Sequence, residues 1–145
     1  MKKESSILIE KISSSPEETK KFGSKLATNL KKGDVVALIG PLGSGKTCLV
    51  QGICAGLGVK EIVTSPSFVI INQYPGRYWV YHFDLYRLKN KKELVDLGYE
   101  EFFYGSGICI IEWAEKIKKL LPKKRIEISL GIISKSERRI KVKRC

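Results

Sequence analysis

The 145-residue sequence has one histidine, one methionine and no long apolar run. Its longest apolar stretches, such as residues 35–39, are far shorter than the roughly 20 residues that cross a bilayer. No apolar region of signal-peptide length lies near the N-terminus, and no repeat or low-complexity segment occurs. These absences exclude membrane-spanning and disordered classes. They predict one globular, cytoplasmic domain over residues 1–145.

The four cysteines are far apart and form no Cys-x-x-Cys pair. Structural zinc normally needs closely spaced ligand pairs, so a zinc site is disfavoured. A chain of this length buries about two-thirds of its unfolded surface and needs no disulfide to hold its core. Reduced, mostly buried thiols are therefore predicted.

Positive charge is concentrated in the last part of the chain. The whole sequence has 27 Lys and Arg against 15 Asp and Glu, a net charge of +12. Residues 116–145 alone hold 12 Lys and Arg against two acids, a net charge of +10. This segment can be a solvated, lysine-rich face, or it can contact a nucleic-acid backbone or an acidic partner. The sequence leaves these alternatives open.

Residue patterns predict alternating strands and helices. Ser15-Pro16-Glu17-Glu18 supplies an N-cap hydroxyl, a proline at the first helical position and a returning glutamate, and the helix it starts is predicted to end at Gly33. The apolar residues 34–39 predict a strand buried on both faces. The other predicted strands are 7–12, 68–74, 78–84, 108–111, 125–133 and 138–143, and the other predicted helices are a segment closed by Gly58, 91–97 and 114–121. The sum predicts an α/β sandwich whose central sheet mixes parallel and antiparallel strands.

The run Gly40-Pro41-Leu42-Gly43-Ser44-Gly45-Lys46-Thr47 matches the phosphate-loop motif G-x-x-x-x-G-K-[ST]. It lies between a predicted buried strand and an amphipathic helix, where such loops occur. Its glycines allow backbone N–H groups to cradle phosphates, Lys46 can reach the β and γ oxygens, and the Thr47 hydroxyl can bind Mg²⁺. The motif refines the prediction to a three-layer sandwich like those of P-loop NTPases.

Two carboxylates at predicted strand ends are candidates for the metal site that a P-loop enzyme needs. Glu112 follows residues 108–111 and is the better match to a hydrophobic strand that ends in an acid. Asp84 follows residues 80–83 and can instead position the attacking water or sense the γ-phosphate. Either one can also be an ordinary surface carboxylate.

Three further residues carry weaker signals. Ser67, in Ser65-Pro66-Ser67-Phe68, lies where switch segments present a hydroxyl to Mg²⁺ and the γ-phosphate, although Ser-Pro-Ser is also an ordinary turn. His82 lies in a strand pattern, where a half-buried histidine with satisfied hydrogen bonds is favoured over a catalytic one. Trp113 is compatible with a simple core residue.

Taken together and in order, four segments resemble the TsaE (YjeE) family, small P-loop ATPases of bacterial tRNA threonylcarbamoyladenosine synthesis. The segments are residues 34–47, Ser65-Pro66-Ser67-Phe68, His82-Phe83-Asp84-Leu85-Tyr86-Arg87-Leu88 and Ile111-Glu112-Trp113. The resemblance implies a P-loop α/β fold and an ATPase with ATP and Mg²⁺ as cofactors. It implies that the protein assists a TsaD–TsaB complex, which forms N6-threonylcarbamoyladenosine at position 37 of tRNAs that read codons beginning with A. Contact with tRNA would be indirect or through the basic C-terminal segment.

The resemblance also implies roles for individual residues. Thr47 and Glu112 would hold Mg²⁺, Asp84 would be a switch or catalytic acid, and Ser67 would sense the γ-phosphate. The segment around Ser15 would approach the nucleotide base. The residues implied to wrap the phosphates are Gly43, Ser44, Gly45, Lys46, Thr47 and Cys48.

The loop departs from the usual family pattern G-D-L-G-A-G-K-T at Pro41 and Ser44, and Ser67 replaces the usual threonine. The sequence shows no evident arginine finger, so slow intrinsic turnover is expected, with Arg87 the nearest candidate. Two other functions stay open at this point. One is a small-molecule kinase, and the other is an assembly or nucleic-acid-binding module that holds ATP without hydrolysing it.

Overall fold

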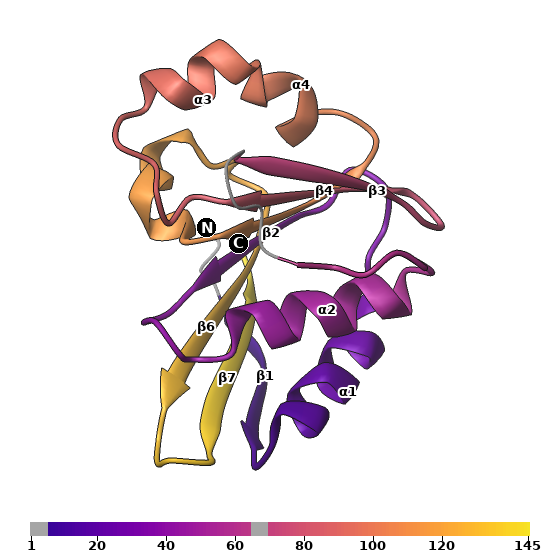
Figure 1. Cartoon of the computed structure of the whole chain (residues 1–145), viewed down its shortest axis with the longest axis vertical. Helices are drawn as coiled ribbons and strands as arrows, with labels where there is room; N and C mark the ends of the chain where they lie inside the picture. The colour runs from indigo at the N-terminus through magenta and orange to yellow at the C-terminus, as the bar shows by residue number, and fades with distance from the viewer. Residues whose placement is uncertain (1–5, 65–69) are drawn as a thin grey trace, which may run out of the picture.

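The structure is a computed structural model that describes residues 6–64 and 70–145, and these residues form one seven-stranded sheet between two layers of helices (Figure 1). The strands lie in the order β1-β7-β6-β2-β5-β4-β3. The bounds of the strands are β1 Ser6–Ser13, β2 Val35–Ile39, β3 Ile71–Pro75, β4 Trp79–Asp84, β5 Ile108–Glu112, β6 Ile126–Ile132 and β7 Arg138–Arg144. The helices are α1 Pro16–Ala27, α2 Lys46–Gly56, α3 Lys92–Leu97, α4 Tyr99–Phe103 and the 3₁₀ helix η1 Ala114–Leu120.

The centre of the sheet is parallel and its edges are antiparallel. Strand β2 lies parallel to both β5 and β6, and β4 is parallel to β5. Strands β1, β7 and β3 complete the sheet through antiparallel pairs. The predicted mixed sheet is therefore confirmed. The parallel arrangement brings the carboxyl ends of β2, β4, β5 and β6 to one edge of the sheet, where ligands of open α/β sheets bind.

Two apolar clusters fill the spaces on either side of the sheet. Val36 and Leu38 of β2 face α1 and α2, where they join a cluster that includes Ile53. Val35 and Ala37 face the opposite way, into a cluster with residues of α3, α4 and η1. Because neighbouring side chains of a strand point to opposite faces, β2 must be apolar on both. This arrangement confirms the predicted three-layer sandwich.

Helices α1 and α2 approach so closely that their backbones touch. A Cβ atom on Gly23 would lie 2.8 Å from the Leu49 carbonyl oxygen, and one on Gly56 would lie 2.6 Å from the Ser24 carbonyl oxygen. A Cβ atom on Gly52 would collide with the Lys20 backbone. These contacts hold α2, and with it the phosphate loop, at a defined position against α1.

Two predicted helices differ from the structure. Helix α1 ends at Ala27 rather than at Gly33, because the N–H groups of Thr28, Asn29 and Leu30 turn to carbonyls three residues back and close a tight turn. Gly33 does adopt a positive φ of 88°, but in the turn after that. The segment that begins at Ala114 is a 3₁₀ helix with a break at Ile117, not a regular helix.

Helix α4 has no counterpart among the predicted elements. It begins directly after Gly98, whose positive φ of 77° ends α3, and it is only five residues long. Its buried Phe103 packs edge-on against Phe83 of β4 with 5.3 Å between the ring centroids. Tertiary packing of this kind stabilises helices that are too short to show a clear hydrophobic period in the sequence.

The environment of the thiols agrees in part with the sequence prediction. All four cysteines are free, and Cys54 and Cys109 are buried. Burial raises the pKa of each of these two thiols to about 12. Cys48 and Cys145 are partly exposed, so half of the thiols rather than most are buried. No helix in residues 6–64 or 70–145 is long and apolar enough to cross a membrane.

Candidate active site

The phosphate loop connects β2 to α2 at the carboxyl edge of the sheet. Gly43 and Gly45 have positive φ angles of 82° and 99°, a conformation that other residues rarely adopt. Gly40 has no room for a side chain, because a Cβ atom there would lie 2.6 Å from the Leu130 carbonyl oxygen. Helix α2 begins at Lys46, so its N-terminal N–H groups and the positive end of its dipole face the space above the loop. The loop thus has the backbone shape of an anion site.

A cavity of about 950 Å³ opens beside this loop. Most of the residues predicted for the site line it, from four separate segments. These residues are Ser15, Gly43, Gly45, Lys46, Thr47, Cys48, Asp84 and Glu112. Ser44 does not line the cavity: its side chain is buried beneath the loop, and its Oγ has no hydrogen-bond partner among the described residues. Ser67 lies outside the described residues.

Lys46 is nearly buried and bonded to its own loop. Its Nζ donates hydrogen bonds to the carbonyl oxygens of Gly40 at 2.5 Å and Pro41 at 3.0 Å. Burial lowers the pKa of the Lys46 ammonium, while the carboxylates of Glu115, Glu112 and Asp84 oppose that shift. A bound polyphosphate would add negative charge and favour the ammonium form further.

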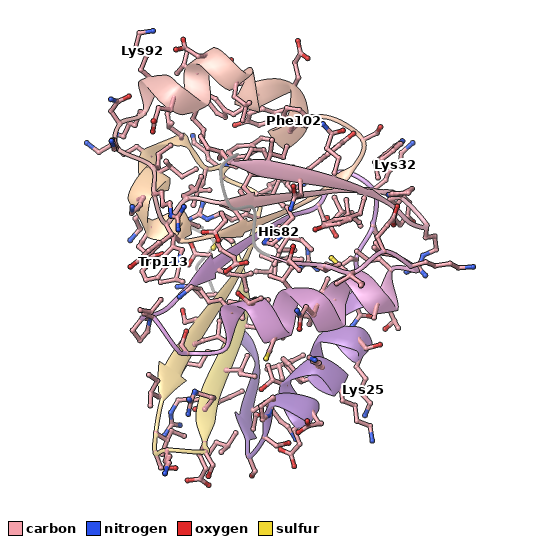
Figure 2. All side chains as sticks on the ribbon, viewed as in Figure 1. Lys25, Lys32, His82, Lys92, Phe102 and Trp113 are labelled. Carbon is pink, nitrogen blue, oxygen red and sulfur yellow. The ribbon has the colours of Figure 1, made fainter. Side chains whose placement is uncertain are left out.

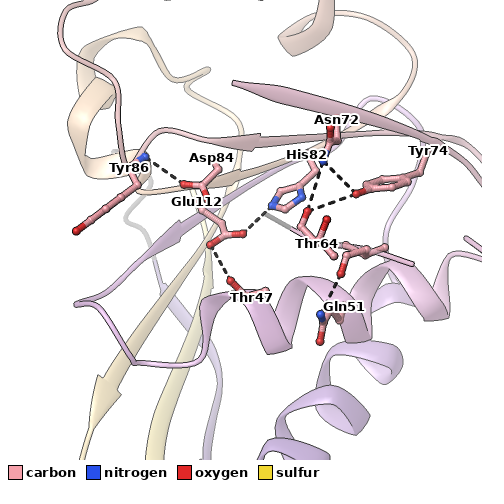
Figure 3. Close-up of polar contacts among 10 residues, drawn as sticks. Thr47, Gln51, Thr64, Asn72, Tyr74, His82, Asp84, Tyr86 and Glu112 are labelled. Carbon is pink, nitrogen blue, oxygen red and sulfur yellow. Dashed lines mark hydrogen bonds and ion pairs between the residues drawn. The ribbon is translucent and has the colours of Figure 1, made fainter. Parts of the chain in front are cut away.

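Glu112 lies at the centre of a short polar network at the end of β5 (Figure 3). Its Oε2 lies 2.6 Å from His82 Nε2, and its Oε1 accepts a hydrogen bond from Thr47 Oγ1 at 3.5 Å. Asp84 is the strand partner of Glu112 in the parallel pair β4–β5. One carboxylate oxygen of Asp84 accepts a hydrogen bond from the Tyr86 backbone N–H at 3.1 Å. Both candidate carboxylates therefore face the first turn of α2 from neighbouring strands.

These oxygen atoms fit Mg²⁺ rather than a softer metal. Mg²⁺ prefers hydroxyl, carboxylate and phosphate oxygens, and it keeps several water ligands, so one or two protein ligands suffice. The Thr47 hydroxyl and the Glu112 carboxylate could serve as such ligands. No group of three or more His, Cys, Asp or Glu side chains suited to binding a metal by itself occurs among the residues that the structure describes.

Trp113 is at the site rather than in a simple core position. It is the one residue other than glycine with a positive φ, 62°, in the described part of the chain. This turn directs its ring over Lys46 Nζ, which lies 3.8 Å from the ring centroid. The Tyr86 ring lies beside that of Trp113, with 5.2 Å between the two ring centroids. Its position next to Glu112, a predicted site residue, was the one sequence feature that could have indicated a role for Trp113. Nothing in the residue pattern predicted its left-handed backbone conformation.

The basic C-terminal segment contributes to the same cavity, which the sequence did not predict. Lys135 and Ser136, in the turn between β6 and β7, line the cavity with Arg138. Arg138 Nε donates to the carbonyl oxygen of Gly43 in the phosphate loop at 3.1 Å, and its Nη1 donates to Ser134 O at 2.9 Å. The turn reaches the loop because β6 runs parallel to β2 and ends at the same edge of the sheet.

Other cations of this segment are paired within the protein. Arg139 forms an ion pair with Glu10 of β1, with 2.6 Å between Nη1 and Oε2. Arg125 forms one with Glu127, with 2.5 Å between Nη2 and Oε2. Lys143 lies 3.6 Å from the same Glu127. The exposed cations of the segment are Lys116, Lys118, Lys119, Lys123, Lys124, Lys135, Arg139, Lys141 and Arg144. Part of the charge excess is therefore neutralised inside the molecule, and part remains in solvent.

Comparison with known proteins gives the family. The family model "Threonylcarbamoyl adenosine biosynthesis protein TsaE" matches residues 13–140. The chain belongs to the TsaE family. This assignment places the protein in the biosynthesis of threonylcarbamoyladenosine in tRNA.

Individual TsaE relatives support the assignment over most of the chain. The TsaE protein of Treponema pallidum is 40% identical over 131 residues, which cover 90% of this chain and 97% of that protein. The TsaE protein of Bacillus subtilis is 44% identical over 126 residues, 86% of this chain and 78% of that protein. The crystal structure of Bacillus subtilis YdiB superposes with a TM-score of 0.83 at 34% identity and covers 99% of this chain and 88% of that chain.

Proposed function

We propose that this TsaE-family protein is a Mg²⁺-dependent ATPase that assists a TsaD–TsaB complex in the formation of threonylcarbamoyladenosine. The observation that carries the proposal is the convergence of the phosphate loop, Thr47, Glu112 and Asp84 on one cavity. A cavity of about 950 Å³ is in the range that holds a nucleotide-sized ligand.

The phosphate loop would bind the β- and γ-phosphates. Lys46 now donates to two neutral carbonyl groups. A triphosphate would offer its ammonium charged acceptors in their place, and such charge-assisted bonds are shorter and stronger. The backbone N–H groups at the start of α2 would hold the same oxygens.

Thr47 and Glu112 would hold Mg²⁺, which would neutralise negative charge on the phosphates when bound. Asp84, the strand partner of Glu112, would orient an attacking water and accept its proton. Arg87 and Arg138 both line the cavity and are the chain's candidates for stabilising charge that develops on the γ-phosphate. Slow turnover by the isolated protein and stimulation by TsaD–TsaB are part of this proposal.

The small-molecule kinase alternative has less support. Such a kinase usually carries an arginine-rich lid inserted late in the chain, whereas five of the late basic residues here lie on the regular strand β7, which pairs with β6. An added nucleoside or sugar that became phosphorylated would revive this alternative.

The test is Mg²⁺-dependent phosphate release from ATP, measured with and without TsaD–TsaB. Hydrolysis that rises with the partners and is lost in Lys46→Ala would support the partner-stimulated ATPase. ATP binding without hydrolysis in both mixtures would instead indicate an assembly factor that holds ATP, and the role of Asp84 would have to be withdrawn.

A further inference from the structure

We propose that His82 is a positioning residue that orients Glu112 for the divalent cation. The proposal rests on the proposed function, because it assigns to His82 a role in the Mg²⁺ site of that same ATPase. His82 lies in the segment 82–88 that carries part of the family resemblance. Neither the sequence pattern nor the phosphate-loop motif assigns a function to it.

The contact between the two side chains is short and buried. His82 is fully buried and Glu112 is 2% exposed. His82 Nε2 lies 2.6 Å from Glu112 Oε2. An ionised carboxylate can only accept hydrogen bonds, so Nε2 must carry the proton in this pair. Figure 2 shows His82 inside the molecule, whereas the labelled Lys25 and Lys92 lie at its periphery.

The two oxygen atoms of Glu112 then have separate partners. Oε2 receives the hydrogen bond of His82, and Oε1 is directed at the Thr47 hydroxyl at 3.5 Å (Figure 3). A carboxylate held by one oxygen cannot rotate freely about its last side-chain bond. The bond from His82 thus keeps Oε1 facing the helix end where Thr47 would share the metal ion. Partners behind a metal ligand commonly set its orientation in this way.

The environment of the other ring nitrogen, Nδ1, indicates that the hydrogen bond to Glu112 is the reason for a histidine at this position. His82 Nδ1 is buried and has no hydrogen-bond partner among the described residues. A buried polar atom without a partner costs stability, and an apolar side chain would avoid that cost. Within residues 6–64 and 70–145, the imidazole makes one buried hydrogen bond, and its partner is Glu112. The strand supports the same geometry, because His82 and Asp84 lie on one face of β4 and Glu112 lies beside Asp84 on β5.

Two amide substitutions separate positioning from packing. The amide nitrogen of glutamine reaches the place of histidine Nε2, whereas that of asparagine reaches only the place of Nδ1. We expect His82→Gln to retain the bond to Glu112 and His82→Asn to lose it. The readout is the binding of a fluorescent, non-hydrolysable ATP analogue as Mg²⁺ is titrated, with a parallel titration in EDTA.

The expected result is a rise of about 10-fold or more in the Mg²⁺ concentration at half-saturation for His82→Asn, within the 10- to 100-fold range typical of such partners. His82→Gln should stay near the wild type, and binding in EDTA should be equal in all three proteins. An unchanged Mg²⁺ requirement in His82→Asn would overturn the inference, as would an equal loss of binding with and without Mg²⁺. A wild type whose analogue binding does not respond to Mg²⁺ would contradict the proposed function itself.

A measurement on the wild-type protein covers the case in which a variant fails to fold. Because the chain has a single histidine, a tag-free, ¹⁵N-labelled sample has one imidazole signal set. We expect a proton on Nε2 that exchanges slowly with solvent and whose resonance shifts when Mg²⁺ is added to the protein with bound analogue. A ring protonated on Nδ1 alone, or an Nε2 resonance that does not shift when Mg²⁺ is added, would overturn the inference.

Discussion

Lys46 and Lys141 carry the same ammonium group in opposite surroundings. Lys46 is 5% exposed and bonded to two loop carbonyls, beneath the Trp113 ring. Lys141 lies exposed on β7, in the hairpin formed by β6, β7 and their turn, which we call the basic hairpin. A buried charge must have partners because it has lost its hydration, whereas an exposed one keeps its water. The number of charges in a region therefore says less about function than their burial does.

The largest contrast is expected between two lysines that both line the cavity, Lys46 and Lys135. Lys46→Ala should weaken ATP binding roughly 100-fold or more, because it removes a buried cation whose proposed contacts with phosphate would be shielded from water. Lys135 is exposed, so Lys135→Ala should weaken binding only a few-fold. Calorimetric titration with ATP measures both. Equal losses in the two variants would refute the distinction.

A second contrast tests packing in place of charge. Gly52→Ala would push a methyl group into the Lys20 backbone and should lower the free energy of unfolding by about 1–3 kcal/mol. A Cβ atom on Gly131, in β6 of the basic hairpin, would meet no other atom within 4 Å, so Gly131→Ala is the matched control and should be close to neutral. Chemical denaturation checks the pair. A neutral Gly52→Ala would show that α1 and α2 can separate at no cost.

Within the basic hairpin itself, Arg138 and Arg139 should behave differently. Arg138→Ala removes the hydrogen bond to Gly43 and should weaken ATP binding by about 1 kcal/mol, or roughly 5-fold. Arg139→Ala should leave ATP binding unchanged, since that side chain is bonded to Glu10 on β1. Fluorescence titration with an ATP analogue distinguishes them. A larger effect at Arg139 would contradict the assignment of Arg138 to the site.

The smallest effect is expected for the ion pair between Glu10 and Arg139. Both side chains are more than two-fifths exposed, at 42% and 44%. Such pairs contribute about 0.2–1 kcal/mol, and salt weakens them. A double-mutant cycle with Glu10→Gln and Arg139→Gln should give a coupling in that range that fades in high salt. A coupling that persisted at high salt would mean that the pair is shielded from solvent.

Prediction from sequence succeeded best where the local pattern and the tertiary environment agree. The N-cap at Ser15 is one such case, because its Oγ accepts from the Glu18 N–H at 3.1 Å as the local residues require. The glutamate returns to the Ser14 N–H at 2.8 Å, one residue before the expected cap. Prediction failed at α4 and at the turn of Trp113, where packing against distant residues decides the conformation.

By itself, the sequence determined the phosphate loop, the two-sided apolar strand β2 and the order of the elements, because glycine spacing and hydrophobic period act over a few neighbouring residues. Only the tertiary structure decided that His82 meets Glu112 and that Arg138 reaches Gly43, 95 residues away in the chain. Both contacts depend on which strands lie side by side. That order is set by the packing of the whole sheet between its two helical layers, which no local pattern encodes.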